Sequence, residues 1–434
     1  MNAQSRRISL LTATAVVVAN MVGTGVFASL GYQVGGLPSG FAILALWLVG
    51  GVCAFCGAVC YGELAAAMPR SGGEYHFLGR IFHPFVGFLA GWISVTVGFA
   101  APIALAAMAF GKYLSGVFPG LPITLCSILM VTAVTLVHQC GVGVAARFQN
   151  TATWLKISLI IVFITAGFLF GEVQPVSFLP AEGDLGLIQS HSFAVSLVYV
   201  MYSYAGWNAA TYIVGDIRDP QRNVPRAIAL GTLLVTALYL LLNAVFLRVT
   251  PMAELKGTLD VGHVAADHIF GLTGGKIMSG LICLGLISCV SAMTWLGPRV
   301  LATMGQDVRS LAIFAKTSPQ GTPTAGLIMQ LLIVIVLIVT STFEKVLTSV
   351  QFGLQLASFA TVVGLIVLRV REPALARPYR CWGYPFTPLI FLIISAWMMF
   401  YIIRDKPQET AAGLLLLAVG AVIYLLGGKK AAAQ

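Results

Sequence analysis

Twelve long apolar runs, separated by short loops, constrain what this chain of 434 residues can fold into. Hydrophobic residues make up 58% of the chain and charged residues 9%, against about 45–50% and about 25% in soluble domains. A single water-soluble core and a disordered chain are therefore both excluded. The runs cover residues 8–34, 39–68, 81–113, 122–140, 149–170, 191–214, 226–248, 276–300, 324–342, 347–370, 385–403 and 411–427.

The length and continuity of these runs indicate membrane-spanning helices. Only helices and closed barrels satisfy the backbone inside a bilayer, and the runs lack the alternation of barrel strands. The basic start MNAQSRRISLL continues into an apolar run without a convincing cleavage site, so we interpret it as a span and not a signal peptide. We expect an all-α polytopic membrane protein with 12 transmembrane helices, in one domain over residues 1–434.

The basic residues predict the orientation. Alternate loops hold most of the Lys and Arg residues, and such loops face the cytoplasm. We therefore expect both termini in the cytoplasm. The lean loops and the lack of a signal sequence favour a bacterial inner membrane. The basic residues that give the net charge of +10 then lie beside anionic lipid headgroups, so the charge does not require a nucleic-acid partner. The larger, cytoplasmic set is Arg6, Arg7, Arg70, Arg80, Arg147, Arg218, Arg222, Arg226, Arg299, Arg309, Lys316, Arg369, Arg371, Arg377, Arg380, Lys429 and Lys430.

Two runs contain helix-breaking residues at corresponding places. Gly23 and Gly25 lie near the middle of the first run, and Ser203, Ala205 and Gly206 near the middle of the sixth. Interrupted helices in matching positions point to a transporter built from inverted repeats. Alternatively, the glycines only let helices pack closely. We expect a five-plus-five arrangement, with repeats over 8–170 and 191–370 and two further helices over 385–427.

An interrupted helix exposes backbone groups that bind charge without charged side chains. The N–H groups at the start of a half-helix suit a carboxylate, and the carbonyl groups at the end of one suit an ammonium group. Lys156 is the single charged residue well inside a run. It could replace a sodium ion, exchange a proton, or extend its amine to the membrane interface.

Four stretches carry a resemblance to a known family. They are GTGVF at 23–27, YGELAAAMPRSGGEYHFLGR at 61–80, YSYAGWNAATYIVGDIRDPQRNVPRAI at 202–228 and LYLLLNAVF at 238–246. The chain resembles the amino acid–polyamine–organocation (APC) superfamily, and within it the L-type (LAT) family and its bacterial relatives. The resemblance implies a LeuT-like arrangement of twelve helices, with the substrate between the interrupted helices 1 and 6.

The resemblance also implies a role for individual residues. A substrate carboxylate would meet the N–H groups around Thr24, Gly25 and Val26. The amino group would meet carbonyl groups around Met21, Tyr202, Ser203 and Ala205. Tyr202 takes the place of the aromatic gate, and Lys156 that of the lysine which substitutes for a sodium site. Asn208 and Tyr239 match polar positions that influence substrate contact or coupling; interhelical hydrogen bonding is the alternative for Asn208, and ordinary packing for Tyr202.

Two departures from the family pattern bear on the substrate. Tyr202 stands where phenylalanine is usual and adds a hydroxyl, and Ala205 stands where many relatives have glycine and adds a methyl group. Both favour small or medium neutral amino acids. No acidic side chain is in view at the expected site, which argues against cationic amino acids and polyamines.

These inferences predict a sodium-independent secondary transporter of neutral L-amino acids that works by alternating access as an exchanger. Proton-coupled symport, uniport and amino acid/polyamine antiport remain alternatives. No catalytic constellation appears at membrane depth, so we expect no enzyme, and we expect no cofactor and no metal site. The loop GKYLSGVFPGLP has no cysteine and Cys126 lies inside the fourth run, so we expect no covalent heavy-chain partner.

Two charge pairings are also expected near the cytoplasmic loops. Glu63 ends the second run and is expected to cap it or to pair near Arg70. Asp216 and Asp219 are expected to form a cluster with the neighbouring arginines. Closure of an inner gate is an alternative role for this cluster.

Overall fold

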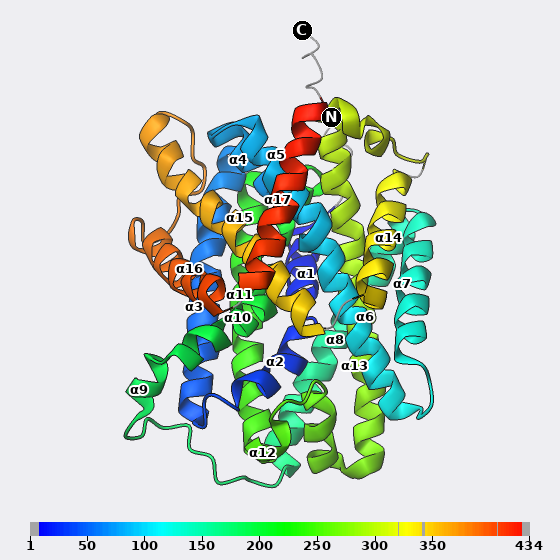
Figure 1. Ribbon diagram of the computed structural model, residues 1–434, viewed down its shortest axis with the longest axis vertical. Coiled ribbons are helices and arrows are strands. Elements are labelled where there is room, and N and C mark those ends of the chain that lie inside the picture. Colours follow the sequence, from blue (N-terminus) through cyan, green and yellow to red (C-terminus); the bar gives the residue numbers. More distant parts are fainter. Residues whose placement is uncertain (1–7, 320, 341–342, 406, 428–434) are drawn as a thin grey trace.

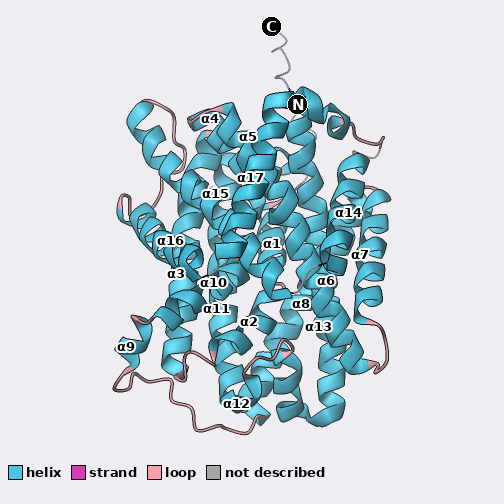
Figure 2. Cartoon of the chain, in the orientation of Figure 1, coloured by secondary structure: helices cyan, strands magenta, loops and turns pink. Residues whose placement is uncertain are grey.

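The computed structural model describes residues 8–319, 321–340, 343–405 and 407–427, and every regular element in these residues is a helix (Figures 1 and 2). Figure 1 shows the long helices running between two ends of the molecule. The short helices α9 (Asp184–Ile188) and α12 (Met252–Leu255) lie at one end, and α4 (Glu74–Ile81) lies at the other. Residues Arg6, Arg7, Lys429 and Lys430, which entered the orientation argument, lie outside the described residues.

Each predicted run contains a helix or consecutive helices. Within the described residues, eight helical stretches are long and apolar enough to cross a membrane, and Ile123–Gln139, Thr324–Thr340 and Thr410–Leu426 are shorter apolar helices. The helical membrane architecture therefore agrees with the prediction, while the count of twelve spans and the inverted repeat stay predictions. The remaining elements are α1 (Leu10–Met21), α2 (Gly25–Gln33), α3 (Gly40–Ala67), α5 (Pro84–Ile93), η2 (Ser94–Phe99), α6 (Ala100–Val117), α7 (Ile123–Gln139), α8 (Val142–Phe170), α10 (His191–Tyr204), η3 (Ala209–Asp216), α11 (Pro220–Val249), α13 (Val261–Asp307), η4 (Arg309–Ala315), α14 (Thr324–Thr340), α15 (Phe343–Arg371), α16 (Phe386–Asp405) and α17 (Pro407–Gly427).

The first run is broken, as its glycines predict. Helix α1 ends at Met21, and Val22 leaves the helical region with φ −77° and ψ 90°. Helix α2 begins three residues later, at Gly25. A Cβ atom on Gly25 would lie 2.5 Å from the Cα atom of Ser203 in α10. Gly25 is therefore required because two backbones meet at this point.

The sixth run is broken as well. Helix α10 ends at Tyr204, and the chain then turns through Ala205 and Gly206 into the 3₁₀ helix η3. Gly206 has φ +98°, a left-handed conformation in which glycine costs least. A Cβ atom there would lie 2.4 Å from Asn20 Nδ2 of α1. The two breaks thus touch each other.

Aromatic side chains hold the helices around the breaks. The Tyr239 ring of α11 packs 5.4 Å from Trp47 of α3 and 5.1 Å from Tyr204 at the end of α10, measured between ring centroids. All three side chains are fully buried. Because buried aromatic pairs lock their neighbours in place, this cluster fixes α11 and α3 against the second break.

The expected pairing of Glu63 with Arg70 is wrong. The Glu63 carboxylate lies 2.5 Å from Arg369 Nη2 and 3.2 Å from Arg377 Nε, and it accepts a hydrogen bond from the Cys381 N–H. Arg70 instead pairs with Asp307 at 2.9 Å. The physical reason is that Glu63, near the end of α3, faces the end of α15 and the segment between α15 and α16, whereas Arg70 follows α3 in a loop.

Candidate functional site

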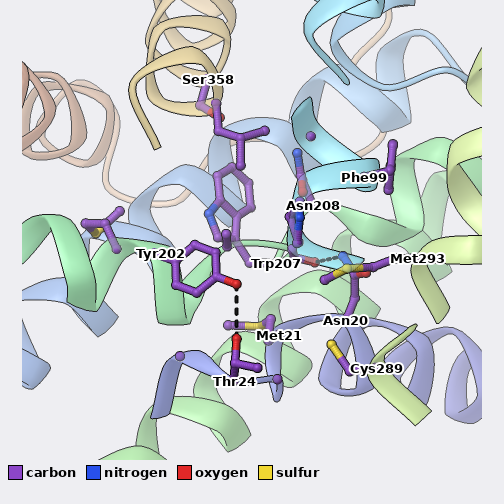
Figure 3. Close-up of a pocket in the computed structure, with 18 of the residues that line it drawn as sticks. Asn20, Met21, Thr24, Phe99, Tyr202, Trp207, Asn208, Cys289, Met293 and Ser358 are labelled. Carbon is purple, nitrogen blue, oxygen red and sulfur yellow. Dashed lines mark hydrogen bonds between the residues drawn. The ribbon is translucent and has the colours of Figure 1, made fainter. Parts of the chain in front are cut away.

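The two helix breaks form the walls of a cavity (Figure 3). It encloses about 810 Å³ of space not filled by atoms, part of it open to solvent. None of its described lining residues has a charged side chain. They are Asn20, Met21, Gly23, Thr24, Gly25, Gly98, Phe99, Pro102, Met201, Tyr202, Ala205, Gly206, Trp207, Asn208, Tyr212, Cys289, Met293, Leu354, Gln355 and Ser358.

The carbonyl end of the first break is held by a buried lysine. Lys156 of α8 donates hydrogen bonds to the carbonyl oxygens of Val22, at 2.5 Å, and Ala19, at 3.2 Å. Its side chain is only 3% exposed. The last carbonyl groups of a helix have no partner within the helix, so the ammonium group stabilises the partial negative charge at the end of α1.

The other side of the first break presents N–H groups. The first hydrogen bonds donated into α2 come from Phe27 and Ala28 to the Thr24 carbonyl oxygen. The N–H groups of Thr24, Gly25 and Val26 precede this pairing, as the first N–H groups of any helix do. Thr24 and Gly25 line the cavity. This is the geometry that suits a carboxylate, because the start of a helix carries partial positive charge.

A hydrogen bond joins the two breaks across the cavity. The hydroxyl groups of Tyr202 and Thr24 lie 3.1 Å apart, and Figure 3 shows them facing each other. Both side chains are buried. The extra hydroxyl noted in the sequence is therefore used to connect α10 to the start of α2.

Behind the cavity, one tyrosine joins the ends of both broken helices. The Tyr239 hydroxyl lies 2.7 Å from the Met21 carbonyl oxygen and 2.9 Å from that of Ser203. It has a single hydrogen to donate, so the two carbonyl groups share it. Ser203 Oγ in turn lies 3.1 Å from Ser29 Oγ of α2. These contacts fix the position of the two breaks relative to each other.

The structure therefore separates the residues singled out in the sequence into two groups. Met21, Thr24, Gly25, Tyr202, Ala205 and Asn208 are among the residues that line the cavity. The other group is absent from the described lining and consists of Val26, Ser203, Tyr239 and Lys156; the last three make hydrogen bonds to the broken helices.

Sequence reasoning missed several lining residues. Asn20 donates to the Gly206 carbonyl oxygen at 3.4 Å, while its own Oδ1 is buried without a described partner. An asparagine two residues before a helix break was the available signal. Trp207 packs on Tyr61, with 4.7 Å between ring centroids, and also lines the cavity. Phe99 and Met293 come from apolar stretches that gave no signal.

A buried carboxylate stands directly behind the cavity. Glu74, the first residue of α4, is 3% exposed. It accepts hydrogen bonds from Asn208 Nδ2 at 2.6 Å and from the Tyr212 hydroxyl at 2.6 Å, both cavity-lining residues. The Tyr61 hydroxyl of α3 donates to it at 2.9 Å. The described lining contains no acidic side chain, but Glu74 stands among the residues that support it.

Charged pairs lie beyond the cavity, on the side of α4. Asp307 at the end of α13 accepts hydrogen bonds from Arg70 and, at 2.8 Å, from the Tyr75 hydroxyl. Burial, and then the hydrogen bond to Asp307, raise the pKa of Tyr75 above its usual value. Asp216, expected to pair within its own loop, lies 3.8 Å from Arg299 of α13. Ion pairs thus connect α13 both to η3 and to the loop before α4.

The arrangement can bind a zwitterion. N–H groups at the start of α2 and carbonyl groups at the ends of α1 and α10 offer opposite partial charges to one enclosed space. Uncharged polar groups complete the lining, including the hydroxyls of Thr24 and Tyr202 and the carboxamide of Asn20. Among the described residues, no group of three or more His, Cys, Asp or Glu side chains is placed to hold a metal ion.

Known proteins similar to this chain are transporters. The chain is 28% identical over 440 residues to large neutral amino acids transporter small subunit 2 of Rattus norvegicus, covering 98% of the chain and 81% of the relative. It is 26% identical to b(0,+)-type amino acid transporter 1 of Mus musculus, over 97% of the chain and 88% of that relative. It is 27% identical to Asc-type amino acid transporter 1 of Mus musculus, over 98% and 82%.

These relatives bear on two predictions. The matched proteins are named as transporters, which confirms the prediction that the chain belongs to a class of transporters and not to a class of enzymes. The rat relative is named as a small subunit, so the relatives lend no support to the expected absence of a heavy chain.

The family comparison covers nearly the whole sequence. The family described as amino acid permease matches residues 8–424, from the start of the first span into α17. The matched region includes both helix breaks, the cavity between them and Lys156. This agrees with the resemblance seen in the sequence motifs, and the chain belongs to the amino acid permease family of the APC superfamily.

Proposed function

We propose that this protein is a sodium-independent secondary transporter that exchanges neutral L-amino acids across the membrane by alternating access. The substrate would lie in the cavity between the two helix breaks. Its carboxylate would accept hydrogen bonds from the N–H groups of Thr24 and Gly25, and its ammonium group would face the carbonyl groups that end α1 and α10.

The observation that carries this proposal is the composition of the cavity. Two facing helix breaks supply backbone groups of opposite polarity, and no lining residue among those described has a charged side chain. Such a site neutralises both ends of an amino acid without a fixed net charge. A charged substrate side chain would instead lose its hydration to an uncharged lining, which costs several kcal/mol. Neutral substrates are therefore favoured.

Lys156 supports independence from sodium. Its ammonium group contacts the carbonyl oxygens of Ala19 and Val22, which are the kind of hard oxygen ligands that an alkali cation would need. A fixed cation at this position takes over the electrostatic role of a bound sodium ion at the end of α1. Uptake then requires no sodium gradient.

The membrane arrangement belongs to the same proposal. We propose twelve spans, with five-plus-five inverted repeats over 8–170 and 191–370. The placement of basic loops favours both termini in the cytoplasm, and the lean loops favour an inner-membrane location. The cysteine-free loop after α6 favours a transporter without a disulfide-bonded partner, because Cys126 lies three residues inside α7. Membrane lipids are then the expected permanent surroundings.

A reconstituted transport assay tests the function. Purified protein is placed in liposomes filled either with buffer or with unlabelled neutral amino acids, and uptake of labelled alanine, serine and leucine is followed without sodium. Exchange predicts uptake only into the filled vesicles. Uptake into buffer-filled vesicles that rises with an inward proton gradient would instead establish proton symport. Absence of amino acid uptake in every condition, or a strict need for sodium, would refute the proposal.

A pair of glycine variants provides the control. Gly25→Ala places a methyl group against the Ser203 backbone, whereas Gly116→Ala, in α6, meets nothing within 4 Å. Uptake that is lost in Gly25→Ala and kept in Gly116→Ala assigns transport to the cavity between the breaks. Equal uptake by both variants would place the substrate elsewhere.

A further inference from the structure

The three groups that bond to Glu74 come from three parts of the chain and are all uncharged. Tyr61 belongs to α3, Asn208 to the turn after α10, and Tyr212 to η3. Tyr61 and Asn208 donate to Oε1, and Tyr212 donates to Oε2. Donors are thus directed at both oxygens, and the side chain is the acceptor in all three bonds.

An acceptor-only carboxylate determines which way the Asn208 carboxamide faces. Only the NH₂ group of an asparagine donates, so this group must point at Glu74. The same Nδ2 atom also lies 3.2 Å from the Tyr212 hydroxyl oxygen. Both donor directions are then used on the side of Glu74. The carboxamide oxygen is left for the opposite side, and Asn208 lines the cavity.

The chain around Glu74 is fastened to η3 by further contacts. The Gly73 N–H donates to the Thr211 carbonyl oxygen at 3.3 Å, and the Gly215 N–H donates to Ser71 Oγ at 2.9 Å. Gly73 has φ +53°, and a Cβ atom there would lie 2.5 Å from the Tyr212 ring. The start of α4 therefore lies directly against the segment that carries Asn208 and Tyr212.

We propose that Glu74 is a positioning residue of the substrate site, which holds the Asn208 carboxamide with its oxygen toward the ligand. The site thereby presents a hydrogen-bond acceptor to an N–H or O–H group of the amino acid. A glutamine at position 74 could donate from its own NH₂ group, which removes the reason for Asn208 to face one way. This inference rests on the proposed function, because it assumes that the cavity binds an amino acid.

A binding cycle on the full-length purified protein tests the proposal. The dissociation constants of labelled alanine and serine are measured for the wild type, Glu74→Gln, Asn208→Ala and the double variant. We expect Glu74→Gln to weaken binding about tenfold, as befits loss of one hydrogen bond to a charged group. In the Asn208→Ala background, Glu74→Gln should cause no further loss. If Glu74 had only a structural role, Glu74→Gln would weaken binding both in the wild type and in the Asn208→Ala background.

The two ligands identify the donor. Alanine carries only its ammonium group as a donor, whereas serine adds a hydroxyl. Weaker binding of both ligands assigns the Asn208 oxygen to the ammonium group, and weaker binding of serine alone assigns it to the side chain. Unchanged affinity for both in Glu74→Gln, or losses that simply multiply in the double variant, would overturn the positioning role.

Two controls protect the result. Gly116→Ala, at a position of α6 with nothing within 4 Å of an added Cβ atom, should leave both affinities within about twofold. Glu74→Asp against Glu74→Asn repeats the charge comparison with a shorter side chain, so the test survives if Glu74→Gln does not fold. If the wild type itself binds neither amino acid, the proposed function fails. Failure of the Glu74 variants alone leaves that function intact.

Discussion

The Lys156 ammonium nitrogen lies 2.5 Å from the carbonyl oxygen of Val22, so a side chain of the fifth predicted span fixes the end of the broken first helix. Val22 is the residue at which α1 stops being helical. The break and the lysine therefore stabilise each other: the break frees carbonyl oxygens, and these oxygens give a buried ammonium group its partners.

Replacing Lys156 tests this relationship. Lys156→Met keeps the length of the side chain but leaves the Ala19 and Val22 carbonyl groups without their donor. We expect uptake to fall at least tenfold and stability to fall by about 1–3 kcal/mol, the cost of unpaired buried polar groups. Thermal unfolding in detergent and liposome uptake measure the two effects. Lys112→Met, at an exposed site of α6, is the control. Full activity and stability in Lys156→Met would contradict the role of the lysine.

The contact between Gly25 and Ser203 makes a second prediction. Gly25→Ala would bring a Cβ atom within 2.5 Å of backbone, which the structure can relieve only by moving α2 from α10. We expect a loss of about 1–3 kcal/mol, typical of overpacking, together with loss of transport. Gly116→Ala, in an exposed position of α6, should gain up to about 1 kcal/mol because alanine favours helix. A similar melting temperature for the two variants would show that the helices are not in close contact.

The hydrogen bond between Tyr202 and Thr24 predicts coupling between two substitutions. Tyr202→Phe and Thr24→Val each remove one hydroxyl, and each should lower stability by about 1 kcal/mol. Because both remove the same bond, the double variant should lose about as much as either single variant. Melting temperatures of the four proteins give the coupling. Strictly additive losses would mean that the two hydroxyl groups bond elsewhere in the membrane-embedded protein.

His76 predicts a dependence of stability on pH. Burial, and then the nearby Arg70, lower the pKa of this α4 imidazole from 6.5 to about 4. Below pH 6.5 the unfolded chain therefore binds a proton that the folded protein refuses, so stability falls as the pH is lowered from 6.5 toward 4. Above pH 6.5 the effect is absent. Melting temperatures measured from pH 4 to 8 should fall less steeply at the acidic end in His76→Gln than in the wild type; parallel curves would exclude this origin.

The amino-acid sequence was sufficient to place the helices and the breaks. The length of an apolar run decides where a chain can cross the hydrocarbon core, and this length is a local property of the sequence. Gly23, Gly25 and Gly206 marked the breaks because a missing side chain or a positive φ is recognisable from residue type alone. The family resemblance singled out Tyr202, Asn208 and Lys156; in the structure the first two line the cavity, and Lys156 contacts the end of α1.

Residues that act through distant neighbours were not recognisable in this way. Glu63 was expected near Arg70, yet it pairs with Arg369, 306 positions away in the sequence. Glu74 drew no attention because its importance depends on Tyr61, Asn208 and Tyr212, which approach it from three other segments. Ser203 and Tyr239 were expected at the substrate, but the packing of α11 places their contacts behind the cavity lining.

The sequence by itself determined that the chain is a helical membrane protein, where its first and sixth runs are interrupted and which family it belongs to. The membrane class and the helix breaks depend on the hydrophobicity and the backbone conformational freedom of individual residues, and both can be recognised from residue type. Only the tertiary structure decided which side chains line the cavity and which stand behind it. That division depends on how α3, α4, α8 and α11 pack around the breaks, and a buried polar group takes its role from the partner that packing brings within hydrogen-bond distance.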